Sequence, residues 1–398
     1  MGDTALDVTG PLAEYITGLR ERLHDLGYQD LQIGRHLCLA ADISAWMHQR
    51  GVALTGLTAQ CLADFFAERR RAGHRRLLSP RAAEPLLGHL RAAGVAATAP
   101  PPSTPVEVLL ARYRQFLVDR RGLAPGTVDG YERAARLFMA SLGDDVDALG
   151  AIGAGEVSAF VTEACAHPVK VSPRELVSEL RSFLRFLFVE GTVAVPLAQA
   201  VPSYAPRTSA GLPRFLTGEQ AARLLASCDR DSATGRRDYA VLVALVRLGL
   251  RAGEVASLRL DDVDWRAGEL RVRGKPRREE RLPLPADVGE AMAAYLREGR
   301  PRVESRAVFI RAIAPLVGLS PTGVTWVVYA ACERAGLPRV GAHRLRHTAA
   351  TQVLRAGGSL VEVGQLLGHR RVATTAIYAK VDHLSLAGLA RPWPGGTR

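Results

Sequence analysis

The chain has 398 residues, 47% of them apolar, and it carries a formal net charge of +12. This length suits two or three domains of ordinary size, each with its own core. A chain this basic is expected to bind a polyanion, and nucleic acid is the first candidate. No apolar run reaches the roughly 18 residues that a membrane span needs, and no basic-then-apolar segment at the N-terminus predicts export.

The cysteines are odd in number and widely spaced, and no CxxC pair occurs among them. This pattern predicts reduced, buried thiols in a cytoplasmic protein, without a zinc knuckle. The five positions are Cys38, Cys61, Cys165, Cys228 and Cys332.

Two linkers divide the chain. The stretch "TAPPPSTP" (98–105) is rich in proline, and "VPSYAPRTSAGLP" (201–213) has proline, serine and glycine at the density of a loop. We therefore expect three domains, at 1–97, 104–200 and 212–398.

The first segment is predicted to be helical. Leu12, Tyr15, Leu19 and Leu23 recur at the spacing of one helix face. The segment ends in a dense basic run, "ERRRAGHRRLLSPR" (68–81). Two interpretations of this run stay open: a patch that binds a nucleic-acid backbone, and an exposed helix end.

The second segment is also predicted to be helical, from three amphipathic stretches between 105 and 191. Thr127 is expected to be the N-cap of one helix. Ser172 is expected to precede another helix, whose first turn begins with Pro173.

The third segment is mixed. A capping box of Thr217 and Gln220 predicts the start of a helix, and the almost wholly apolar stretch 237–251 predicts a buried one. The stretches 269–274 and 280–285 alternate like strands around a turn that contains Lys275. We therefore expect a helix-rich α+β domain with one small sheet.

The stretch "AHRLRHTAAT" (342–351) crowds cations and imidazoles into an apolar neighbourhood. On a helix, His343, Arg346 and His347 share a face, and their charges repel unless an anion lies between them. A zinc site on the two histidines is disfavoured, because arginines stand where the zinc-protease pattern needs a glutamate. A solvated basic helix stays open as the simpler alternative.

Other chemically competent residues surround this stretch in the sequence. Arg251 follows the buried helix, where it is costly unless it is paired with Glu254 or Asp261, or directed at an anion. His369 follows a glycine expected to end a helix, and Tyr378 comes nine residues later in a predicted short helix.

Five motifs in this order resemble the tyrosine recombinase, or phage integrase, family. They are "GLRAGE" at Arg251, "GK" at Lys275, "HRLRH" at His343 and Arg346, "LGH" at His369 and "IYAKV" at Tyr378. Residues 104–195 resemble the family's helical core-binding domain. Residues 1–97 resemble no domain that we can name, although some integrases carry an arm-site or accessory domain there. The turn departs from the family's frequent GKGxK, since this chain has "GKPRR".

The resemblance implies an enzyme that cuts and rejoins DNA through a 3′-phosphotyrosyl intermediate. Arg251 and Arg346 would hold the phosphate, and His343 and His369 would donate further hydrogen bonds. Tyr378 would be the nucleophile, with His343 accepting its proton and Lys275 protonating the leaving 5′-oxygen. No metal, cofactor or ATP is expected.

Further contacts with DNA are expected from an arginine-rich hairpin and from arginines beside the site, although a solvated hairpin stays open. The candidates are Arg271, Arg273, Arg277, Arg278, Arg344 and Arg370. Phosphate contacts of this kind give salt-dependent affinity with little sequence choice. The two helical segments and the catalytic domain would form a clamp around the duplex.

The expected partner is double-stranded DNA, with a homotetramer acting on two sites and accessory recombinases or DNA-bending proteins as further candidates. The expected role is integration, excision or transposition of a mobile element, in a cytoplasmic, nucleoid-associated protein with no membrane partner. The alternative is a non-catalytic DNA-binding relative with an architectural or regulatory role.

Overall fold

The computed structural model describes residues 8–95, 102–166, 172–202, 215–274 and 278–368, together with Thr375 and Tyr378. These residues are mainly helical with one small antiparallel sheet, as the sequence predicts. The chain forms two compact units: one spans 97–209, and the other combines 1–96 with 210–398. The division into three domains therefore stays a prediction. None of the described helices is both long enough and apolar enough to span a membrane.

Residues 8–95 contain four α-helices with their own apolar cluster. The helices are α1 (Ile16–Asp25), α2 (Asp30–Gln49), α3 (Ala59–Arg71) and α4 (Glu84–Ala92). Leu19 and Leu23 are buried in this cluster, which confirms the predicted apolar face of α1. The basic run begins in the last turn of α3 and continues through an exposed turn.

The unit at 97–209 has four described α-helices: α5 (Pro105–Asp119), α6 (Pro125–Ser141), α7 (Ala154–Ala166) and α8 (Pro173–Val189). Its core holds Tyr113 and Phe183, whose ring centroids lie 4.9 Å apart. Ser172 is the N-cap of α8, as predicted. The prediction for Thr127 is wrong, because α6 begins two residues earlier. Pro125, with its φ already set for a helix, occupies the first turn there.

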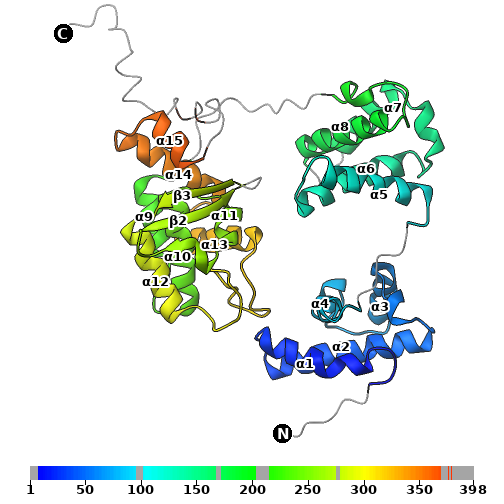
Figure 1. The fold of residues 1–398 in the computed structure, drawn as a ribbon, viewed down its shortest axis with the longest axis horizontal. Coiled ribbons are helices and arrows are strands. Elements are labelled where there is room, and N and C mark those ends of the chain that lie inside the picture. Colours follow the sequence, from blue (N-terminus) through cyan, green and yellow to red (C-terminus); the bar gives the residue numbers. More distant parts are fainter. Residues whose placement is uncertain are drawn as a thin grey trace, which may run out of the picture. The chain divides into compact units, whose positions relative to one another are not determined.

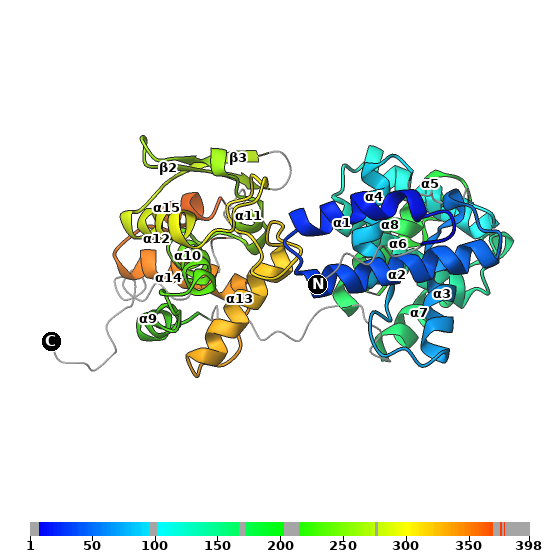
Figure 2. The same ribbon diagram turned by 90° about the horizontal axis from the view of Figure 1, so that it is seen from below.

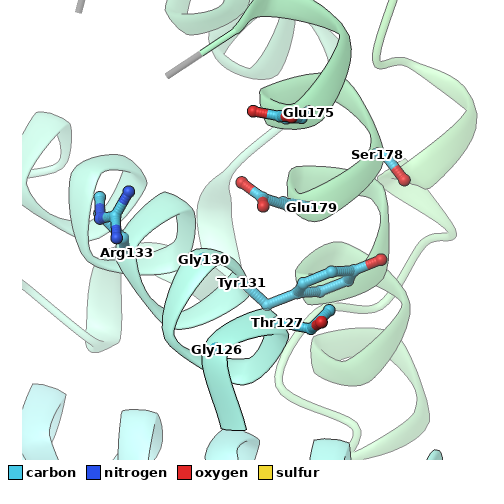
Figure 3. Close-up of a pocket in the computed structure, with 8 residues that line it drawn as sticks. All are labelled: Gly126, Thr127, Gly130, Tyr131, Arg133, Glu175, Ser178 and Glu179. Atoms are coloured by element: carbon cyan, nitrogen blue, oxygen red, sulfur yellow. The ribbon is translucent and has the colours of Figure 1, made fainter. Parts of the chain in front are cut away.

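A cavity of about 410 Å³ lies between α6 and α8 (Figure 3). Glu175 and Glu179 lie one above the other on α8 and face α6. Burial raises the pKa of Glu179, and the neighbouring Glu175 raises it further. Two carboxylates disfavour a phosphate in this cavity, despite the presence of Arg133 in its lining.

In the segment from 215 to 368, the other helices surround one buried helix, α10 (Ala233–Leu248) (Figures 1 and 2). Its α-helical neighbours are α9 (Gly218–Ala226), α11 (Ala252–Ser257), α12 (Ala286–Glu298), α13 (Pro321–Arg334) and α14 (Ala342–Arg355). Because α10 has neighbours on most sides, its sequence is apolar almost all round, as the sequence predicts. The short helix α15 (Leu360–Leu366) packs against α14.

Side chains cap the start of several helices in this segment, and the predicted capping box of Thr217 and Gln220 is one of these caps. Thr217 and Gln220 form a capping box at α9, and Ser359 and Glu362 form another at α15. Ser320 accepts a hydrogen bond from the backbone of Gly323 at the start of α13. Each of these side chains satisfies a backbone N–H that has no partner within its helix.

The sheet has three antiparallel strands in the order β1 (Val263–Asp264), β2 (Glu269–Gly274) and β3 (Arg278–Pro283). The sequence predicted the hairpin of β2 and β3, with β3 placed two residues too late, and it showed no sign of β1. Leu270 and Val272 are buried, while Arg271 is exposed on the other face of β2. Glu280 pairs with Val272, so it lies on the face turned toward the core.

All five cysteines are free thiols. Cys228 and Cys332 are buried, as predicted. Cys38 is exposed on α2, so the expectation that all five thiols are buried is wrong.

Candidate active site

The end of α10 places Arg251 at the site. Gly249 has a φ of +60°, which ends α10 in the left-handed conformation that glycine adopts without strain. Arg251 then becomes the N-cap of α11 and donates to Glu254 Oε1 at 2.5 Å. The predicted pairing with Glu254 is therefore present, whereas Asp261 pairs with Arg306. Half of the Arg251 side chain remains exposed, so it is open to an anion.

Helix α14 positions Arg346 differently. This side chain is only 3% exposed, and its guanidinium donates to the carbonyl oxygens of Gly249, at 2.6 Å, and Leu367. It therefore joins the end of α10 to the end of α15. A guanidinium has five N–H donors, so donors remain for a phosphate after these two contacts.

The electrostatics show that these cations lie close together. Burial, with the charge of Arg251, lowers the pKa of Arg346 to about 10, so the group is still charged at neutral pH. Burial also lowers the pKa of His343, as do Arg346 and then Arg251. His343 is thus a neutral, exposed imidazole beside two arginines at neutral pH.

The Tyr378 hydroxyl meets a histidine that sequence reasoning did not assign to catalysis. It lies 2.7 Å from His347 Nδ1, and the ring of His347 lies 4.5 Å from that of His343. Tyr378 is 1% exposed and packs in an apolar cluster that includes Leu354 and Leu367. Burial raises the pKa of the phenol, while Arg346 acts in the opposite direction. The only sequence signal for His347 was its position on the face shared with His343.

Two acidic residues were also missed as parts of the site. Glu254 is 8% exposed, and Glu254 and Glu280 both favour the charged form of Arg346. Glu280 lies so close to Gly368 that a Cβ there would fall 2.5 Å from its Oε2. Strand β3 therefore approaches the end of α15, next to the predicted site residues. The sequence offered Glu254 only as a possible partner of Arg251, and no sequence pattern distinguished Glu280 from a surface carboxylate.

Several candidates lie outside the described residues. They are Lys275, Arg277, His369 and Arg370, and for Arg278 only the backbone is described. Their roles stay predictions.

The described arginines of the hairpin differ from one another. Arg273 donates to the buried Asp262 at 2.6 Å, which gives it a structural partner. Arg271 is exposed and lies opposite Arg281, which pairs with Glu269. Arg344 on α14 is partly buried. A DNA-facing role for the hairpin stays a prediction.

The described candidates lie close to one another. The candidate site lies beside α14, near the ends of α10 and α15. It brings together two guanidiniums, two imidazoles and a phenol. Fixed cations stabilise the charge that develops on phosphate oxygens during displacement, and a phenol supplies a nucleophile. Such an arrangement suits phosphoryl transfer, the chemistry by which DNA strands are broken and joined.

Comparison with known sequences agrees with this class. The phage integrase family matches residues 214–384, and the N-terminal SAM-like domain of phage integrases matches residues 110–191. The chain is 40% identical to a protein of Sinorhizobium fredii named integrase/recombinase y4rA, over 97% of this chain and 95% of that protein. It is 32% identical to tyrosine recombinase XerC of Oceanobacillus iheyensis, over 70% of this chain and 94% of that protein.

The chain therefore belongs to the phage integrase family of tyrosine recombinases, and it is a site-specific DNA recombinase. Solved structures share the fold at low identity. XerH recombinase in a post-cleavage complex with its difH substrate has a TM-score of 0.56 at 17% identity, over 82% of this chain and 94% of that one. The Tn1549 transposon integrase has a TM-score of 0.52 at 15% identity, over 71% and 99%.

Proposed function

We propose that Tyr378 attacks a phosphodiester of duplex DNA and forms a 3′-phosphotyrosyl link, during integration, excision or transposition of a mobile element. The observation that supports this most directly is the Tyr378 hydroxyl, held beside the helix that carries His343 and Arg346. A phenol next to a buried, charged guanidinium is an unusual arrangement without an anionic substrate to bind.

The proposed roles follow from the positions of the groups. The exposed part of Arg251 and the remaining donors of Arg346 bind the non-bridging oxygens, where negative charge grows as the phosphorus becomes five-coordinate. His343 and His369 donate further hydrogen bonds. Lys275 gives a proton to the departing 5′-oxygen.

The covalent link conserves the energy of the broken bond. The 5′-hydroxyl of another strand attacks the phosphotyrosine, and Tyr378 leaves with its proton restored. No ATP is consumed, and the cations of the site replace a metal ion. We propose that four subunits act on two duplexes in this way. In support, a lambda integrase tetramer bound to a Holliday junction shares the fold, with a TM-score of 0.51.

A nicked duplex that carries the recombination site tests the proposal. After cleavage, the short fragment beyond the nick diffuses away, so the protein stays attached to the DNA. We expect a covalent complex that forms equally fast with and without EDTA, measured on a denaturing gel. A complex that needs a divalent metal would contradict the proposed chemistry.

We further propose that the basic run in residues 68–81 contacts DNA phosphates. Its one acidic residue, Glu68, pairs with Arg50, and the residues from 69 to 81 include six arginines and no acidic residue. Arg69 pairs with Asp42 and is largely covered, whereas Arg71, Arg75 and Arg76 are exposed. Exposed guanidiniums in a stretch without carboxylates suit a polyphosphate chain.

The salt dependence of DNA affinity tests this proposal. Replacing Arg71, Arg75 and Arg76 by glutamine should flatten the plot of log affinity against log salt, by roughly 0.9 for each phosphate that the variant no longer neutralises. The matched control replaces three exposed arginines elsewhere in the same segment: Arg20, Arg35 and Arg91. Equal slopes for the two triple variants would show that only overall charge matters.

A further inference from the structure

We propose that His347, and not His343, accepts the proton of Tyr378 during strand cleavage. This inference rests on the proposed function of Tyr378, and it replaces His343 as the base that the family resemblance implies. The geometry is direct: His347 Nδ1 lies 2.7 Å from the hydroxyl oxygen, which is the distance of a strong O–H···N hydrogen bond. In the described structure, no hydrogen bond joins His343 to this hydroxyl; its ring instead contacts the ring of His347 edge-on.

The local packing holds this contact in place. The Tyr378 ring is 1% exposed among the apolar side chains of α14 and α15, so its hydroxyl has little freedom to turn to water. The carbonyl of His347 accepts from Thr351, within the helix. The imidazole of His347, rather than solvent, is therefore positioned to accept the proton of the phenol.

The proton balance is simple. Neutral His347, with its hydrogen on Nε2, takes the proton from Tyr378 as the phenolic oxygen bonds to phosphorus and the bond to the 5′-oxygen breaks. The 5′-oxygen receives its proton from Lys275 under the proposed function. On rejoining, the phenol oxygen leaves phosphorus and recovers the proton from the His347 imidazolium, which returns to neutral.

The surroundings suggest how DNA activates this base. Burial lowers the pKa of His347 to about 4, with His343, Arg346 and Arg344 acting in the same direction. Arg346 itself is near the positive charge of Arg251 and the negative charges of Glu254 and Glu280. The free protein therefore keeps His347 neutral. A phosphate between the arginines offsets their charge and raises the pKa of His347, so the base becomes stronger when substrate is bound.

The test measures single-turnover cleavage of the nicked duplex between pH 5.5 and 9, for the native protein and two matched variants. In His347→Asn, the amide occupies the place of Nδ1 but cannot take a proton. In His343→Asn, the same change is made one helical turn earlier. DNA affinity of each variant, measured separately, controls for folding, and His347→Gln replaces the first variant if it does not fold.

We expect His347→Asn to cleave about 10²–10⁴-fold more slowly at pH 7, the usual contribution of a general base. Its rate should rise about tenfold per pH unit, because hydroxide must then remove the phenolic proton. The His343 variant should be slower but keep the native profile. A native profile in the His347 variant, or the rising profile in the His343 variant, would overturn the assignment. A failure of the proposed function is recognised separately. If Tyr378 were not the nucleophile, the adduct would still form in Tyr378→Phe.

Discussion

Replacement of Tyr378 by phenylalanine is expected to abolish the covalent complex with nicked DNA. The change removes one oxygen atom and keeps the ring that fills the cluster around Leu354 and Leu367. The loss should be on the order of 10⁶-fold, the scale seen when a covalent nucleophile is removed from an enzyme. Cleavage is measured on a denaturing gel, and DNA binding by gel shift should change little.

The matched control is Tyr239→Phe. This tyrosine lies under the Arg230 guanidinium, which is 4.4 Å from the centre of the ring, so the change leaves that contact intact. The control should form the adduct at the native rate. An adduct that persists in the Tyr378 variant at more than a trace would show that another residue attacks the DNA.

Replacement of Arg346 by lysine is expected to lower the cleavage rate by about 10²–10³-fold, the effect of losing one donor to developing charge. Lysine keeps the charge but lacks the planar fork that reaches Gly249 and Leu367 together. One of these buried carbonyls then loses its partner, at a cost of about 1–3 kcal/mol in the free energy of unfolding. Single-turnover rates and thermal unfolding measure the two effects.

The control for this change is Arg355→Lys, on the same helix. Arg355 lies over the ring of Phe215, 4.9 Å from its centre, and has no contact with the site among the described residues. Its replacement should leave the cleavage rate within a few-fold of native. Equal losses for the two variants would mean that Arg346 acts through the stability of α14 alone.

The sequence predicted local structure well where a single motif determines it. The capping box predicted at Thr217 is present, because it needs only two side chains three positions apart. The predicted cap at Thr127 is wrong, because Pro125 occupies the first turn and the helix begins there, before Thr127. Strand β1 has two residues, too few for any alternation to be visible.

The sequence named candidate residues for the site, but it did not reveal the contacts between them. The family motifs point to Arg251, His343 and Arg346, and the described structure brings these groups together. The contact between Tyr378 and His347 joins residues 31 positions apart in the chain, so no helical spacing could reveal it. Glu280 favours the charged form of Arg346, and its position depends on the register of β3 against β2. The sequence does not reveal this register either.

The most direct test of the account is to identify the amino acid that carries the DNA. The trapped complex is digested with nuclease and trypsin, and the modified peptide is sequenced by mass spectrometry. Tyr378 lies in the expected tryptic peptide VATTAIYAK (372–380), where it is the only tyrosine. We expect a nucleotide phosphate on Tyr378 in this peptide, and a nucleotide attached to any other residue would contradict the role proposed for Tyr378.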